Sequence, residues 1–275
     1  MKYSFLILGI VLLSCSGNKT VKVKGSDTEV NLAVQFAESF HHYKPSLFVS
    51  VSGGGSGLGI ASLLNGTADI ANSSRRINDK EVALFLEKGI ALDSFIFAQD
   101  AIAFIVADDL PMESISTQQL ADVLSGKVRD WEQITGKHLP VNIYGRQSNS
   151  GTHDFVKDRL HIAFSPRAKQ MNGNAQIVEA IRADHSGIGY VGAGYVSAGA
   201  NKGIKVLPVY TTDKVDAVSP LDAAKIEEGK YFFQRPLFQY FRAKDSIQVR
   251  PFIDFEQSAE GQKIIKTGGY YPVGK

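Results

Sequence analysis

The chain has 275 residues, of which 30 are Lys or Arg and 28 are Asp or Glu, so its formal net charge is +2. This near-neutral balance, with no dense basic stripe, argues against a protein that binds nucleic acid. The single cysteine, Cys15, excludes an intrachain disulfide, and after residue 20 no apolar run is long enough to cross a bilayer.

The first twenty residues have the pattern of a targeting segment. Lys2 provides a positive start, and residues 5–13 form a short apolar run that is typical of a signal-peptide core. The small residue Ser14 directly before Cys15 resembles the lipobox of bacterial lipoproteins, in which the cysteine receives lipid such as palmitate and becomes the mature N-terminus. We therefore predict a signal peptide at residues 1–14, lipidation at Cys15, and a polar tether over residues 15–20.

The next segment predicts a strand, a turn and a helix. Alternating apolar residues over 21–24 predict the strand, which runs into the turn Gly25-Ser26-Asp27-Thr28. Ser26 or Asp27 can cap the helix that follows. Helical spacing predicts that the inward face of this helix consists of Val30, Val34, Ala37 and Phe40.

The same order recurs twice. Residues 47–51 predict a second strand, the glycine-rich residues 53–57 a turn, and residues 56–65 a helix with Ile60, Leu63 and Leu64 inward. A short third strand is expected at residues 68–71, before a polar turn at 72–75. Repeated strand–turn–helix units indicate a parallel α/β sheet, with ligand groups at the carboxyl ends of its strands.

The remaining chain continues as an α/β pattern without a long linker. The predicted strands lie at residues 95–97, 101–107, 141–144, 188–191, 205–209 and 237–241. Helices are expected at residues 117–124, around Trp131, at 153–164, 175–183 and 220–228, with two more within 245–267. If the chain forms two lobes, it must pass from one to the other along strands. The best candidates for these crossing points are near residues 96–101 and 207–212.

Arg146 and the segment Ser150-Gly151-Thr152 form the pattern most informative for function. Arg146 lies at the end of a predicted strand. Four positions later, the small residues Ser150, Gly151 and Thr152 begin a predicted helix. Helix N-termini present unpaired N–H groups and the positive end of a dipole. A guanidinium adds a planar fork that can hold two oxygens. Together they predict a site for a tetrahedral oxyanion.

These motifs, taken in order, resemble a known family. The resemblance rests on residues 25–28, the segment 52–60, the segment 66–75, the Arg146 to Thr152 turn, and residues 187–191. The chain resembles the phosphate-binding proteins that feed bacterial phosphate ABC transporters, within the periplasmic binding-protein superfamily. The resemblance implies an α/β fold of type II with two lobes, two crossover strands and hinge closure on the ligand. It places residues 21–97 and 211–275 in one lobe and residues 98–210 in the other.

The resemblance also assigns phosphate contacts to positions in this sequence. They are Ser26, Asp27, Thr28, Ser56, Ser74, Arg146, Ser150, Gly151 and Thr152. Family members often have an aspartate in the third turn that accepts a proton from the ligand, whereas this chain has Ser74 there. Our hypothesis is that Asp27 takes over as acceptor. No catalytic residue, cofactor or metal ligand is expected.

The function implied is a high-affinity phosphate receptor that delivers its ligand to the permease of an ABC transporter. The expected protein is a monomer on the periplasmic face of the cytoplasmic membrane, attached to that membrane through its lipid alone.

Three alternatives stay open on the residues alone. One is a receptor for another oxyanion, such as sulfate, molybdate or tungstate. The second is a phosphate-ester hydrolase with Ser150 or Ser56 as nucleophile, and the third is a sensor or adhesin. His153 and Asp154 lie too near Ser150 in sequence to favour a triad. Residues 187–192 match the dinucleotide-binding glycine pattern but lack its strand–turn–helix context, so we predict a strand there.

Overall fold

The computed structural model describes residues 19–196, 202–211 and 216–273. The predicted signal peptide and the lipidation site Cys15 lie outside these residues. The last two residues of the predicted tether, Lys19 and Thr20, belong instead to the first strand, where they pair with Leu47 and Phe48. Within the described residues, no helix has the length and apolar character needed to cross a membrane.

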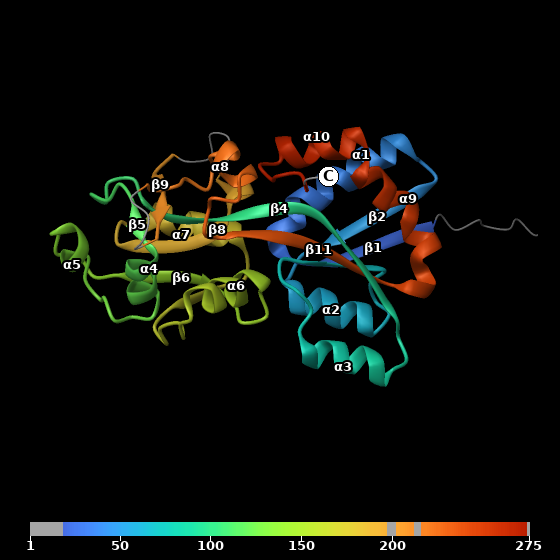
Figure 1. Cartoon of the computed structure of the whole chain (residues 1–275), viewed down its shortest axis with the longest axis horizontal. Helices are drawn as coiled ribbons and strands as arrows, with labels where there is room; N and C mark the ends of the chain where they lie inside the picture. The colour runs from blue at the N-terminus through green and yellow to red at the C-terminus, as the bar shows by residue number, and fades with distance from the viewer. Residues whose placement is uncertain (1–18, 197–201, 212–215, 274–275) are drawn as a thin grey trace, which may run out of the picture.

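The first lobe is a sheet covered by helices on both faces (Figure 1). Its parallel strands are β1 (Lys19–Gly25), β2 (Leu47–Ser52) and β3 (Ile70–Ser73). One face carries α1 (Val30–Tyr43), α9 (Ser246–Gln257) and α10 (Ala259–Thr267). The other carries α2 (Ser56–Leu64) and α3 (Asp79–Glu87). An apolar cluster lies on each side of the sheet, one around Phe40 and Phe252 and the other around Leu63 and Phe85.

The second lobe repeats this layered arrangement. Its central parallel strands are β6 (Asn142–Arg146), β7 (Lys169–Met171) and β8 (Gly187–Gly192). The long strand β4 (Leu92–Ala107) pairs with β8 on one side and with β9 (Ile204–Leu207) on the other. A separate short pair joins β5 (Ile115–Ser116) to β10 (Val209–Tyr210). The helices are α4 (Thr117–Leu124), α5 (Glu132–Thr135), α6 (Gly151–Leu160), α7 (Asn174–Ala183) and α8 (Ala223–Glu227).

Two strands, β4 (Leu92–Ala107) and β11 (Gln234–Arg242), connect the lobes (Figure 1). β4 pairs antiparallel with β11 as far as Ala101 and with β8 from Ile102 onward. The two strands predicted at residues 95–97 and 101–107 are therefore one continuous strand. The change of partner in β4 lies between Ala101 and Ile102.

The second crossing differs from the expected one near residues 207–212. Ile226, Tyr231 and Phe233 are buried in the second-lobe core together with Phe104, so the described chain stays with that lobe until β11 begins at Gln234. The physical reason is apolar burial, because these three side chains find their partners in the second lobe. The boundary expected at residue 211 thus falls about twenty residues too early.

The buried face of α1 also differs from the prediction. Leu32, Phe36 and Phe40 are fully buried, whereas Val34 is 38% exposed. The larger side chains recur every four residues and bury more apolar surface than the face through Val34 would. The helix is therefore rotated relative to the predicted face, although its position along the chain was predicted correctly.

Candidate anion-binding site

The polar turns predicted from the sequence meet between the lobes. From the first lobe come the turn η1 (Asp27–Glu29) after β1, the start of α2 and the end of β3, and from the second lobe come the end of β6 and the start of α6. The side chains brought together there are all at most 3% exposed except that of Asp27. The buried ones are Ser26, Thr28, Ser56, Ser74, Arg146, Ser150 and Thr152.

The first turns of α2 and α6 face each other across the cleft. A Cβ atom added at Gly151 would lie 2.5 Å from the Ser56 Oγ and 2.7 Å from the Ser74 Oγ. The backbone N–H of Gly57 donates to the Asn149 carbonyl of the other lobe at 3.1 Å. Two helix N-termini, each the positive end of a helix dipole, therefore converge on one small polar space.

The first-lobe turn is held in place by a glycine that no other residue could replace without a shift. Gly25 has φ +140°, and a Cβ there would lie 2.1 Å from the Asn72 carbonyl oxygen. This close approach lets the Ser26 N–H donate to the same oxygen at 2.9 Å. As a result the Ser26 Oγ reaches the Ser74 Oγ, to which it donates at 3.1 Å.

Arg146 joins the two lobes through Asp27. Its guanidinium donates to the Asp27 Oδ2 at 3.2 Å and to the Asn172 carbonyl at 2.9 Å. Burial lowers the pKa of Arg146, and the negative charge of Asp27 opposes that shift. The Asp27 Oδ2 also accepts from the backbone N–H of Asn174 at 2.8 Å and from its side-chain amide at 2.6 Å. Protein donors thus surround the Oδ2 of Asp27, the residue that the sequence hypothesis had made the acceptor of the ligand's proton.

A second buried guanidinium, Arg235, was not predicted. Arg235, the second residue of β11, is 1% exposed and donates to the Asp100 Oδ2 at 3.0 and 2.8 Å. Its NH2 group also donates to the hydroxyls of Thr28 and Thr152, one from each lobe, at 3.2 and 3.0 Å. Burial raises the pKa of Asp100, and the charge of Arg235 counteracts this shift. Neither residue belongs to a recognisable motif, so only their proximity in space reveals them.

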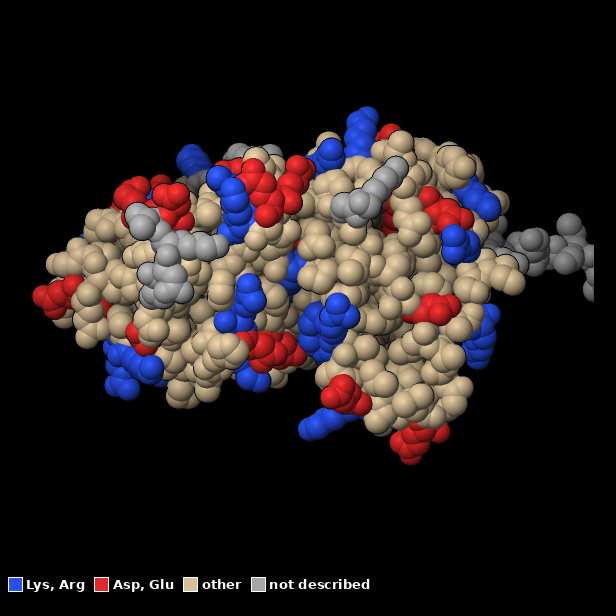
Figure 2. Space-filling view, in the orientation of Figure 1, with Lys and Arg blue, Asp and Glu red and all other residues tan. Residues whose placement is uncertain are grey.

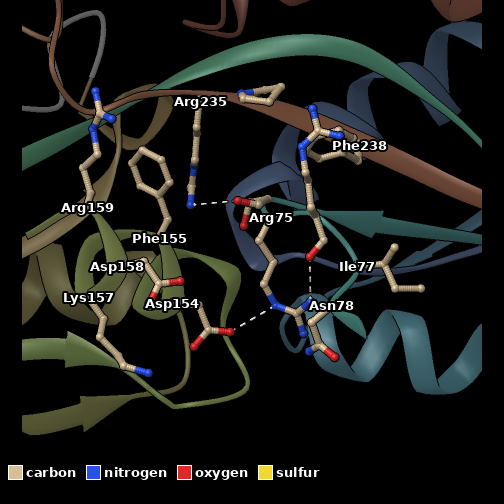
Figure 3. A pocket seen from close by; sticks show the side chains of 13 residues that line it. Arg75, Ile77, Asn78, Asp154, Phe155, Lys157, Asp158, Arg159, Arg235 and Phe238 are labelled. Atoms are coloured by element: carbon tan, nitrogen blue, oxygen red, sulfur yellow. Dashed lines mark hydrogen bonds and ion pairs between the residues drawn. The ribbon is translucent and has the colours of Figure 1, made fainter. Parts of the chain in front are cut away.

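Beside the buried site, a cavity of about 650 Å³ opens between the lobes. Figure 2 shows charged side chains of both signs gathered where the two halves of the molecule meet. Arg75 binds Glu81 of its own lobe at 2.8 and 2.7 Å, and its Nε lies 3.1 Å from the Asp154 Oδ2 of the other lobe. In Figure 3 Arg235 extends toward this cavity beside Phe155. Ion pairs between the lobes therefore border the site.

Two alternative motifs, a hydrolase triad around Ser150 and a dinucleotide-binding glycine loop, lack the geometry that their chemistry requires among the described residues. His153 lies 3.3 Å from Asp154, whereas the Ser150 Oγ accepts from the Thr152 N–H, and no described contact links Ser150 to His153. The glycine pattern at residues 187–192 is β8, as predicted. A Cβ at Gly189 would lie 2.4 Å from the Ile177 Cγ2, so glycine there allows α7 to pack closely on the strand.

The fold and the site define a two-lobed binding protein, with an anion-type site enclosed between lobes that two strands connect. Comparison with known families agrees, because the model of the PBP superfamily domain matches residues 15–260. The chain belongs to the PBP superfamily.

Individual relatives are similar over nearly the whole chain. The phosphate-binding protein PstS of Borreliella burgdorferi is 27% identical, over 97% of this chain and 95% of that protein. PstS of Staphylococcus saprophyticus is 28% identical over 88% of this chain and 76% of its own length. An ABC-type phosphate transport receptor from Vibrio cholerae has the same fold, with a TM-score of 0.72 and 24% identity, covering 92% of this chain and all of that one.

Proposed function

We propose that this protein binds inorganic phosphate with high affinity between its lobes and delivers it to the permease of an ABC transporter for import. The observation that carries the proposal is the enclosure of one small polar space by hydroxyls, helix N-termini and guanidiniums from both lobes. The names of its relatives support phosphate as the anion. Ser26, Asp27, Thr28, Ser56 and Ser74 would contact it from one lobe, and Arg146, Ser150, Gly151 and Thr152 from the other.

The strength of binding follows from the number of donors. A hydrogen bond to a charged group contributes about 1.5–3 kcal/mol net. Micromolar affinity needs about −8 kcal/mol in total. Half a dozen donors from the two lobes therefore suffice for micromolar or tighter binding, provided that closure excludes water from them.

We further propose that the protein is anchored outside the cell by a lipid. Residues 1–14 would be removed as a signal peptide, and a lipid on Cys15 would hold a monomeric receptor on the outer side of the cytoplasmic membrane. The protein would perform no chemistry on its ligand. Mass spectrometry of the mature N-terminus tests this directly, because lipidated Cys15 predicts a diacyl or triacyl mass increment on the first residue.

Calorimetric titration of the full chain in detergent, after unfolding and refolding to remove ligand carried from the cell, tests the binding function. Saturable one-to-one binding of phosphate at micromolar or lower Kd is expected. Absence of phosphate binding would contradict the proposal. Release of phosphate from p-nitrophenyl phosphate, lost on Ser150→Ala, would instead favour the hydrolase alternative.

A further inference from the structure

Glu29 is a buried carboxyl group beside the site that the contacts described so far leave unexplained. It ends the turn η1, directly after Thr28, and is 0% exposed. Its backbone N–H donates to the Ser26 carbonyl at 3.3 Å, so Glu29 and Ser26 belong to one tight turn. Neither of its carboxyl oxygens has a hydrogen-bond partner among the residues that the structure describes. An ionised carboxylate buried in this way lacks the donors that it needs.

The titratable groups that face Glu29 from neighbouring elements offer it no counter-ion. Asp100 of β4, Glu256 of α9 and Tyr270 after α10 are all acidic. The nearby cation is Arg235 of β11, whose described hydrogen bonds go to Asp100, to two threonine hydroxyls and to a backbone carbonyl. Burial raises the pKa of Glu29 well above its ordinary value, and the charge of Arg235 opposes this shift only in part. These surroundings favour the neutral form, which can donate one hydrogen bond.

A chain of serine hydroxyls leads from Glu29 to the space between the lobes. The Ser26 hydroxyl opposes the rise in the pKa of Glu29 more than any other side chain, so the two groups are neighbours, although the described geometry does not join them by a hydrogen bond. The Ser26 Oγ donates to the Ser74 Oγ at 3.1 Å, and a Cβ at Gly151 of the other lobe would lie 2.7 Å from that Ser74 oxygen. Because Ser26 gives its proton to Ser74, its own oxygen can accept from Glu29.

We propose that Glu29 is a positioning residue, held as a neutral acid, that donates to the Ser26 hydroxyl and thereby directs the Ser74 hydroxyl as a donor toward the bound phosphate. The inference rests on the proposed function for the identity of the ligand. If Glu29 were ionised, Ser26 would donate to it, and the Ser74 proton would turn toward Ser26. The lone pairs of Ser74 would then face the anion, close to a further buried negative charge. In the neutral arrangement each donor polarises the next and strengthens the last bond to the ligand.

Infrared spectroscopy of the full chain in detergent tests the state of Glu29, because a neutral carboxyl group has a carbonyl stretching band that a carboxylate lacks. At neutral pH we expect Glu29→Gln to lose one such band relative to the parent, with and without phosphate. Glu256→Gln, the matched control, removes another buried carboxyl group of the same lobe and should keep the band of Glu29. An unchanged carboxyl band in Glu29→Gln would overturn the inference, because Glu29 would then be ionised.

Calorimetric titration with phosphate tests the orienting role. Glu29→Gln keeps a donor of the same shape and should bind phosphate within about threefold of the parent, whereas Glu29→Met, of similar size but without a donor, should bind it at least about tenfold more weakly. Urea unfolding measures the stability of both variants, which a purely structural role would change without this split in Kd. Equal Kd values for Glu29→Met and the parent would overturn the orienting role. Absence of phosphate binding by the parent would refute the proposed function, whereas the infrared result decides the state of Glu29 with or without the anion.

Discussion

Replacing Asp27 by alanine tests how the lobes are held together. Asp27 belongs to the first lobe, but its Oδ2 accepts only from second-lobe groups among the described contacts, namely Arg146 and both nitrogens of Asn174. Asn174 begins α7, whose N-cap Gly173 offers no side chain. Asp27 therefore places a carboxylate at the N-terminus of a helix in the other lobe, where it is favourable to the helix dipole.

The magnitude follows from these contacts. Each hydrogen bond to a charged group is worth about 1.5–3 kcal/mol, but three bonds to one oxygen do not add fully. The side chain is also 19% exposed, so water replaces part of what is lost. We expect the closed form to lose about 2–4 kcal/mol, which is about a 30- to 1,000-fold weaker phosphate Kd if ligand binds the closed form.

Calorimetry with phosphate measures this loss, and circular dichroism checks that the variant folds. Asp93→Ala is a matched control, because Asp93 is exposed on β4 in the same lobe. The control should bind phosphate as the parent does. If Asp27→Ala also binds phosphate with parental affinity, the bridge between the lobes makes no contribution to closure and the reasoning is wrong.

Three further changes test other parts of the site and the core. Arg146→Ala should weaken phosphate binding by at least about 1.5 kcal/mol in calorimetry, and parental affinity would remove Arg146 from the site. Gly151→Ala should weaken phosphate binding by about 1–3 kcal/mol, because its Cβ would lie 2.5 Å from the Ser56 Oγ; an unchanged Kd would show that the two helix starts do not meet in the bound form. Burial raises the pKa of Glu256 to about 8 from an ordinary value of 4.5, so the folded state holds a proton that the unfolded state releases. This group's contribution to stability is therefore complete below about pH 4.5 and declines as pH rises to about 8, by up to about 5 kcal/mol. Glu256→Gln keeps an acceptor for Gln239 and should flatten this decline in urea unfolding measured across that pH range; an equal slope in the variant would refute the assignment.

The polar turns that meet between the lobes could be predicted as turns because they lie at the ends of strongly patterned elements. The turns at residues 25–28, 53–57 and 146–152 each combine glycine with small hydroxyl residues directly after a strand. In a parallel α/β layer such turns share one edge of the sheet, which brings residues 25–28 and 53–57 together in the first lobe. The turn at residues 146–152 belongs to the other lobe, and contacts between the lobes bring it to them.

Arg235 and Asp100 could not be predicted in the same way. Each lies within a crossing strand, in a largely apolar sequence that carries no turn signal. Their pairing depends on the antiparallel register between β4 and β11, which places Arg235 opposite Asp100. That register joins residues 135 positions apart, and a single sequence gives no measure of it.

Local signals also fail where several surfaces compete for one segment. No helix was predicted at residues 79–87. The structure has α3 there, and Asn78 and Glu81 form the capping box at its start. The chain after β10 carries apolar residues that suit either lobe, and only the packing of Tyr231 and Phe233 against Phe104 decides it. Tertiary burial, not propensity, sets such boundaries.

The measurement that tests the central claim most directly is a crystal structure of the protein grown with arsenate, a tetrahedral anion of phosphate's geometry whose position anomalous scattering can locate. We expect one anion enclosed between the lobes, within hydrogen-bond distance of groups at the start of α2, of Arg146 and of groups at the start of α6. An anion bound elsewhere, or this space filled only by protein side chains at saturating arsenate, would contradict it.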